Sequence, residues 1–158
     1  MIVVGIGEYA ITNTIEETII THALGSCVAV IIYCGKNKYT AMAHVVLPKP
    51  TDRTNMENYK MKPGYFATDI VPKLVKYFTD ELECNKNDLE VYIVGGADSM
   101  QEEDVFFVGK KNVAMVRHLL NTNGIRTYAS DTGGNLSRTV SIQCSDGHVF
   151  VKRQNMIL

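Results

Sequence analysis

The sequence lacks the features of a membrane protein, a secreted protein or a nucleic-acid-binding protein. No apolar run approaches the roughly 20 residues of a membrane helix, and the N-terminus has neither the basic leader nor the apolar stretch of a signal peptide. Lysine and arginine are scattered, and the densest run is only Lys110-Lys111, so no basic stripe suited to phosphates is visible. We therefore expect a protein that is not membrane-embedded, binds no nucleic acid and resides in the cytoplasm.

Cysteine is also sparse for a disulfide scaffold. A chain of this length with four cysteines and no export signal favours reduced thiols. At least one thiol is then available for chemistry. The four are Cys27, Cys34, Cys84 and Cys144.

The overall composition is typical of a folded globular protein. The chain has 158 residues, 46% of them hydrophobic and 21% charged, with a formal net charge of -1. This length can bury a substantial core without covalent staples. No repeat or linker-like stretch divides it, so we predict a single domain over residues 1–158.

Strand and helix patterns alternate along the chain. The segments "CVAVIIYC" and "KYTAMAHVVLP" predict two antiparallel strands around a turn that starts at Gly35, and prolines end the second strand. Apolar spacing predicts two helices, and Gly124 is placed to cap the second. The expected class is α/β or α+β, and its hairpins argue against a purely parallel sheet. The other predicted elements are helices over about 68–83 and 110–123, a buried strand in "LEVYIVGGA" that runs into a glycine turn, and a hairpin around Asp146-Gly147.

The first hairpin decides whether Cys27 and His44 come together. A two-residue loop at Gly35-Lys36 places them directly opposite each other, on one face. A four-residue loop from Gly35 to Lys38 makes them diagonal neighbours on that same face. A three-residue loop separates them onto opposite faces. The sequence leaves these registers open.

A thiol beside an imidazole has a recognisable chemistry. The imidazole can take the thiol proton and hold the pair as thiolate and imidazolium, which makes a nucleophile for an acyl carbon. Gly25 and Ser26, just before Cys27, leave room for a substrate carbonyl, and their backbone N–H groups are candidate oxyanion donors.

Two other interpretations stand beside this one. Buried cysteine and histidine are often ordinary core residues. A zinc site from His22, Cys27, Cys34 and His44 is conceivable, although the sequence has no C-x-x-C or H-x-x-x-H pair. The glycine pairs at 95–96 and 133–134 fit turns and lack the spacing of a phosphate loop. We expect neither a metal ion nor a cofactor.

Several motifs together resemble one family. The segments "ITHALGSCVAV", "MAHVVLP", "VGGA", "VGKKNVAMV", "GI" and "DTGGNLSRTV" are similar, in this order, to CheD, the family of chemoreceptor glutamine deamidases. The resemblance spans nearly the whole chain. It departs from the family pattern at "GKKN", where an acidic-basic pair as in G-E-R-N is expected, and this bears on partner preference.

The resemblance implies a function and a site. It implies hydrolysis of glutamine side-chain amides on the cytoplasmic helices of chemoreceptors, with Cys27 as nucleophile, His44 as general base and Thr21 holding the imidazole. It further implies a layered sandwich of mixed sheets with flanking helices, similar to the deamidase domain of cytotoxic necrotizing factor toxins. CheC phosphatase is the expected partner, with Phe106 and Phe107 as candidate contacts.

Two alternatives to deamidation remain open. The chain could serve mainly as a regulatory binding module for the phosphatase, or the same thiol could hydrolyse receptor methyl esters, since all acyl transfers by this chemistry share a thioester.

Overall fold

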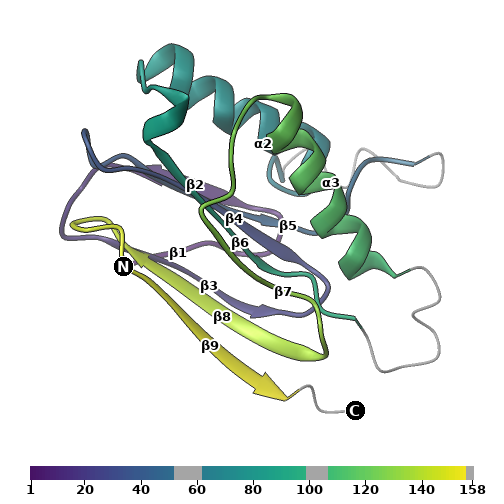
Figure 1. Cartoon of the computed structure of the whole chain (residues 1–158). Helices are drawn as coiled ribbons and strands as arrows, with labels where there is room; N and C mark the ends of the chain where they lie inside the picture. The colour runs from purple at the N-terminus through teal and green to yellow at the C-terminus, as the bar shows by residue number, and fades with distance from the viewer. Residues whose placement is uncertain (52–61, 99–106, 156–158) are drawn as a thin grey trace.

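Two β-sheets and two helices stack in three layers (Figure 1). The structure is a computed structural model that describes residues 1–51, 62–98 and 107–155. The first sheet has the strand order β1-β3-β8-β9, and the second has the order β2-β5-β4-β6-β7. The first comprises β1 (Ile2–Val3), β3 (Thr18–Leu24), β8 (Leu136–Gln143) and β9 (Val149–Asn155). The second comprises β2 (Tyr9–Thr12), β5 (Thr40–Val45), β4 (Val28–Cys34), β6 (Leu89–Gly95) and β7 (Ala129–Thr132).

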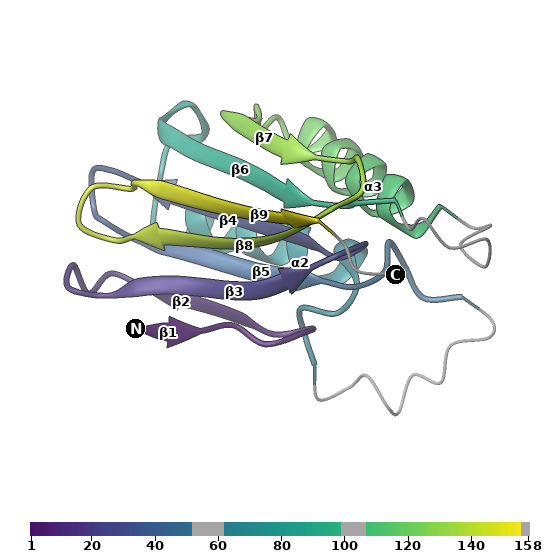
Figure 2. The same cartoon turned by 90° about the horizontal axis from the view of Figure 1, so that it is seen from below.

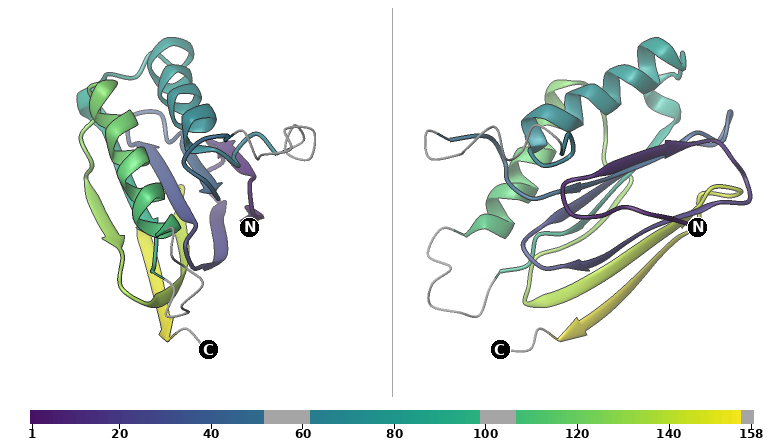
Figure 3. Two further views of the ribbon diagram at one scale, coloured as in Figure 1. Left: turned by 90° about the vertical axis from the view of Figure 1, so that its right-hand side faces the viewer. Right: turned by 180° about the vertical axis from the view of Figure 1, so that it is seen from behind.

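Both sheets are mixed. In the first, β1 runs parallel to β3, and in the second, β6 runs parallel to β7, whereas the remaining neighbours are antiparallel. The expectation of an α+β layered sandwich of mixed sheets with flanking helices is therefore confirmed. Figure 2 shows the first sheet from its open side, and Figure 3 shows both helices on the far face of the second sheet.

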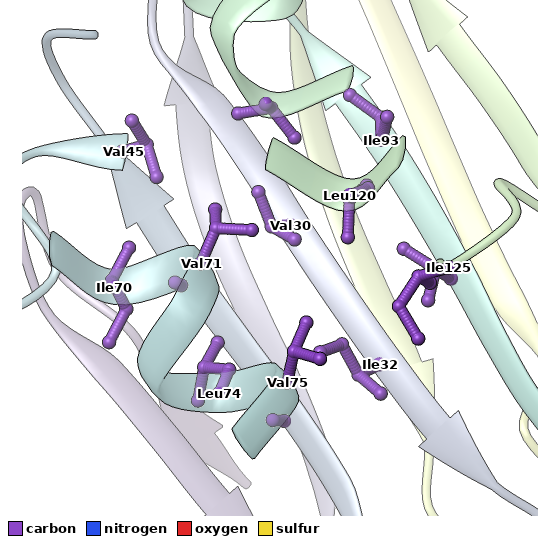
Figure 4. Close-up of a cluster of buried hydrophobic side chains, with 14 of the residues drawn as sticks. Val30, Ile32, Val45, Ile70, Val71, Leu74, Val75, Ile93, Leu120 and Ile125 are labelled. Carbon is purple, nitrogen blue, oxygen red and sulfur yellow. The ribbon is translucent and has the colours of Figure 1, made fainter. Parts of the chain in front are cut away.

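The helices cover the second sheet through an apolar interface. Helix α2 (Ala67–Lys76) buries Ile70 and Leu74 on the same face, and a π-helical turn, η1 (Tyr77–Glu81), extends it. Helix α3 (Val108–Thr122) buries Val116 and Leu120, and Gly124 follows with φ of 71°. Figure 4 shows Ile70, Leu74 and Leu120 of the helical layer among side chains of the sheet such as Val30 and Ile93. Both predicted helices and the glycine cap are confirmed.

Strand β4 explains why its sequence is apolar throughout. All seven of its residues are buried, because it lies in the middle of the second sheet with a layer on each side. Val30 and Ile32 face the helices, while Ala29 and Ile31 face the first sheet. A strand covered on both faces needs apolar residues at every position.

The turn between β4 and β5 has four residues. Ala29 pairs with His44 and Tyr33 with Thr40, so Gly35 to Lys38 form the loop and the two-residue alternative is wrong. Lys38 adopts a φ of 63°, and the Asn37 side chain accepts a 3.0 Å hydrogen bond from the Tyr39 N–H.

The last hairpin has the same loop length. The expected strands β8 and β9 are present, but the loop runs from Cys144 to Gly147, with a bond from the Gln143 N–H to the His148 carbonyl. The predicted hairpin around Asp146-Gly147 is confirmed, and only Gly147 of that pair has a positive φ, 72°. Within the described ranges, neither helix is long and apolar enough to cross a bilayer.

Candidate active site

Thr21 and His44 meet between the two sheets. Thr21 lies on β3 of the first sheet, His44 lies on β5 of the second, and both are buried. The Thr21 hydroxyl is 2.6 Å from His44 Nδ1 and 2.6 Å from the Val4 carbonyl oxygen. The main chain of His44 is also held, because its N–H donates to the Glu8 carbonyl and its carbonyl accepts from the Gly7 N–H.

This network assigns the tautomer of His44. The Val4 carbonyl can only accept, so the single hydroxyl proton of Thr21 goes to it. The proton shared by Thr21 and His44 must then come from Nδ1. Nε2 of the neutral ring consequently carries a lone pair, which is the form that a general base requires.

Burial keeps the imidazole neutral. His44 is 1% exposed, and desolvation lowers its pKa from 6.5 to about 4. Nε2 is buried and has no hydrogen-bond partner among the residues that the structure describes. A buried ring nitrogen without a partner is available to receive a proton from a neighbouring group.

Cys27 packs on the same side of the second sheet as His44. The β4–β5 ladder begins at Val28 and Val45, one residue after Cys27. Ala29, which pairs with His44, belongs to the buried cluster between the sheets against which Cys27 packs. Continued by one residue, this register makes Cys27 a diagonal neighbour of His44, a relation that spans about 7 to 8 Å. Cys27 is half-buried and forms no hydrogen bond through its sulfur within the described ranges.

The thiol at rest is protonated. Desolvation raises the pKa of Cys27 to about 11, and no charged group among the described residues offsets it. With the pKa of His44 lowered by the same cause, the neutral thiol and neutral imidazole are favoured over a standing thiolate–imidazolium pair. Any reaction of Cys27 as a nucleophile therefore has to remove its proton during the attack.

Residues 25–27, which form the turn at Cys27, are held by their carbonyl oxygens. The Gly25 carbonyl accepts from the Ala97 N–H at 2.8 Å, and the Cys27 carbonyl accepts from the Gly96 N–H at 2.8 Å. Between them, the Ser26 carbonyl accepts from Asn112 Nδ2 at 2.9 Å. The peptide planes of this turn are thus fixed from one side.

The N–H groups of the same turn remain available. Neither the Ser26 N–H nor the Cys27 N–H donates a hydrogen bond to another described residue. An added Cβ at Gly25 would meet nothing within 4 Å, so the turn is open there. Two unpaired N–H groups beside a thiol and an open space fit the requirement for stabilising an oxyanion.

Two irregularities shape this end of the sandwich. Strand β3 has a bulge between Thr21 and Leu24, where Ala23 takes a φ of 55°, and bulges are common next to active sites. Gly95 has a φ of 115°, and a Cβ there would collide with the Cys27 carbonyl oxygen. The glycine is needed for the strand to approach the turn, which accounts for the first glycine of "VGGA".

The remaining candidate residues are not gathered at this site. Phe107 is 52% exposed at the start of α3, with the Lys110 ammonium 5.1 Å from its ring centroid, while Phe106 lies outside the described residues. Cys34 is buried at the far end of β4, and His22 is exposed. Among the described residues, no three His, Cys, Asp or Glu side chains group to hold a metal, so the zinc alternative has no ligand set.

Asn112 is the residue that sequence reasoning missed. It is fully buried on α3, and its Nδ2 donates to both the Ser26 and the Val46 carbonyls at 2.9 Å. A signal was present, because Asn112 lies on the buried stripe of α3 with Gly109, Val116 and Leu120. A polar residue on the apolar face of a helix calls for a specific partner.

A family model and two curated relatives that match this chain carry the same family name. The family model "CheD chemotactic sensory transduction" matches residues 46–153. The chain is 40% identical over 152 residues to a probable chemoreceptor glutamine deamidase CheD of Syntrophotalea carbinolica, covering 95% of this chain and 92% of the relative. It is 38% identical over 151 residues to the chemoreceptor glutamine deamidase CheD of Thermotoga maritima, covering 96% and 90%.

A solved structure shares the fold. The Bacillus licheniformis hypothetical protein YfiH superimposes with a TM-score of 0.51 at 12% identity, over 79% of this chain. The chain spans about half, 50%, of that structure's length. At this identity the likeness concerns the fold alone.

Proposed function

The chain belongs to the CheD family, and we propose that it is a chemoreceptor glutamine deamidase in which Cys27 is the nucleophile and His44 the general base. Relatives that align over 90% or more of their own length carry the deamidase name. The family model begins at residue 46, so the proposal for Cys27 and His44 is supported by the geometry of this chain.

The Thr21–His44–Val4 network is the observation that carries the proposal. It holds the imidazole, assigns the proton to Nδ1 and leaves Nε2 as a buried lone pair on the face that Cys27 shares. A purely structural histidine in a core would be expected to have both nitrogens satisfied. The unpaired nitrogen is explained if its partner is the thiol proton during catalysis.

The first half-reaction forms a thioester. As Cys27 Sγ attacks the side-chain amide carbon of a substrate glutamine, its proton passes to His44 Nε2. The resulting oxyanion is stabilised by the N–H groups of Ser26 and Cys27, each such donor being worth about 3 to 4 kcal/mol. His44 then protonates the amide nitrogen, ammonia leaves, and a glutamyl thioester remains on Cys27.

The second half-reaction hydrolyses the thioester and regenerates the free enzyme. His44 Nε2 takes a proton from a water molecule that attacks the thioester carbon, and the same N–H groups stabilise the second oxyanion. The carbon–sulfur bond breaks, the proton returns to the sulfur, and glutamate is released. The balance is glutamine plus water giving glutamate plus ammonia, which requires neither metal nor cofactor.

Incubation with receptor fragments tests this function. Wild type should release ammonia and convert specific glutamines to glutamates, as measured by peptide mass spectrometry, whereas Cys27→Ala should do neither while keeping its circular-dichroism spectrum. Loss of methyl esters without loss of amides would favour receptor methyl-ester hydrolysis. Full conversion by Cys27→Ala would reject the thiol mechanism.

We also propose that the CheC phosphatase binds this protein, and that both act in the cytoplasm where receptor helices are presented. Phe107, 52% exposed at the start of α3, is the candidate contact for this partner, since aromatic side chains are enriched at the centres of protein interfaces. Titration of CheC against wild type and against Phe107→Ala would measure the contribution of Phe107 to the binding affinity. If Cys27→Ala stimulates the phosphatase but wild type deamidates nothing, the regulatory role is primary.

A further inference from the structure

We propose that Asn112 is a positioning residue that aims the Cys27 N–H at the oxyanion, an inference that rests on the proposed hydrolytic function. Nothing in the sequence pattern of the thiol and the imidazole points to this residue. It lies 85 positions from the nucleophile along the chain, yet it contacts the peptide unit that carries the Cys27 N–H.

The planarity of one peptide unit links Asn112 to the nucleophile. The Ser26 carbonyl and the Cys27 N–H belong to the same peptide, which is trans because the described chain contains no cis bond. In a trans peptide the C=O and N–H vectors point in opposite directions. By holding the Ser26 carbonyl at 2.9 Å, Asn112 therefore sets the direction of the Cys27 N–H.

The same hydrogen bond strengthens the donor. A peptide whose carbonyl accepts a hydrogen bond is polarised, and its N–H becomes a better donor, an effect that is larger in a buried environment. Asn112 is fully buried, so its bond to the Ser26 carbonyl is shielded from water. The Cys27 N–H has no acceptor among the described residues, so its full capacity remains for a ligand.

Asn112 also ties the nucleophile to the strand of the base. Its second contact is to the carbonyl of Val46, which lies two residues after His44. Two carbonyl acceptors require an NH₂ group with both hydrogens engaged, a requirement that Ser, Asp or an apolar side chain cannot meet. The nucleophile turn and the end of β5 are thereby held by one side chain.

The backbone around Asn112 is arranged for this approach. Gly109 lies one turn earlier on the same face of α3, and a Cβ there would collide with the Ala97 carbonyl oxygen. The glycine lets α3 come close enough for Asn112 to reach Ser26. Asn112 Oδ1 is buried without a partner in the described part of the chain. A residue that only stabilised the core would be poorly chosen here, since an unpaired buried acceptor is unfavourable.

The test separates oxyanion stabilisation from folding. Acylation of Cys27 by p-nitrophenyl acetate passes through an oxyanion, whereas alkylation by iodoacetamide is a displacement without one. Asn112→Ala should lower the acylation rate, and kcat for receptor glutamine, by about 10-fold to 10²-fold, the larger figure being typical of losing one oxyanion donor altogether. Alkylation of Cys27, followed by peptide mapping, should stay within about threefold of wild type. Val116→Ala, on the same helix and equally buried, should lose thermal stability and keep both rates.

Each outcome decides the matter. Parallel loss of acylation and alkylation, or no loss of either, would overturn the inference. If Asn112→Ala does not fold, Asn112→Ser, which keeps one donor, is measured in its place, and a crystal structure of wild type with a glutamine aldehyde needs no variant at all. The hemithioacetal oxygen should then lie on the Cys27 N–H with Asn112 still on the Ser26 carbonyl, and any other location of that oxygen rejects the proposal. Wild type that acylates with the ester but leaves receptor glutamines intact would contradict the deamidase function and not this role.

Discussion

Replacing Thr21 with valine removes the hydroxyl on which the orientation of His44 depends, with almost no change of shape. Two buried groups then lose their partner, the Val4 carbonyl and the His44 Nδ1–H. Leaving a buried polar group unpaired costs about 1 to 3 kcal/mol, so the two together should lower the free energy of unfolding by about 2 to 6 kcal/mol. This is a large part of the stability of an ordinary domain.

The same substitution should impair catalysis beyond its effect on stability. Without the hydroxyl, the imidazole is free to rotate and to move its proton to Nε2, and that tautomer cannot accept the thiol proton. General-base catalysis contributes about 10² to 10⁴ in rate, which bounds the expected loss of kcat. Thr21→Ser is the matched control, because it keeps the hydroxyl and loses only a methyl group.

Both effects are measurable on the same samples. Urea unfolding at 25 °C gives the change in stability, and ammonia release from receptor fragments, corrected for the folded fraction, gives kcat. We expect Thr21→Val to lose activity by at least about tenfold in the folded fraction, and Thr21→Ser to retain most of it. Unchanged kcat in Thr21→Val would refute the assignment of Thr21 as the group that holds the base.

Three further predictions follow from the buried pair and its turn. Burial lowers the pKa of His44 from 6.5 to about 4, so the unfolded state binds a proton at a higher pH than the folded state does. The free energy of unfolding should therefore fall by about 3 kcal/mol as the pH drops from 6.5 towards 4. Urea titrations should show a flatter pH dependence for His44→Gln than for wild type. Because burial raises the pKa of Cys27 to about 11, its alkylation by iodoacetamide should still be rising with pH above 9, and a plateau near neutral pH would show a resting thiolate. Gly95→Ala should displace the Cys27 carbonyl and lower kcat and the melting temperature together, whereas Gly133→Ala, where a Cβ meets nothing within 4 Å, should lower mainly stability through its φ of 81°.

The central strands were predictable because burial on both faces leaves a plain apolar signal. Strand β4 and the helices α2 and α3 follow directly from such patterns. Strand β3 was not predicted, since the bulge at Ala23 exposes two successive residues and breaks the alternation. Strands β2 and β7 have four residues each and are too short to give a pattern.

The register of the first hairpin shows where local sequence stops being sufficient. "GKNK" is compatible with loops of several lengths, and the choice depends on the left-handed Lys38 and on the Asn37 side chain that bonds to the Tyr39 N–H. A four-residue loop, one of the lengths considered, puts Cys27 and His44 on the same side of the sheet. Their protonation was not, because the pKa values depend on burial between two sheets.

The contacts of Thr21 and Asn112 could not be predicted from local sequence either, because their partners lie far away along the chain. Thr21 reaches His44 across the gap between the sheets, so no spacing within one element could predict the contact, and only the family resemblance pointed to it. Asn112 gave a signal of its own as a polar residue on a buried helical stripe. The identity of its partners required the tertiary structure.

Trapping the acyl-enzyme tests the central claim most directly. Wild type is mixed with a receptor fragment for a single turnover, quenched in acid, which preserves thioesters, and mapped by peptide mass spectrometry. The mechanism predicts a glutamyl thioester on Cys27 that disappears as glutamate forms, and no adduct on Cys34, Cys84 or Cys144. Turnover of glutamine with an adduct on another thiol, or undiminished turnover by Cys27→Ala, would contradict it.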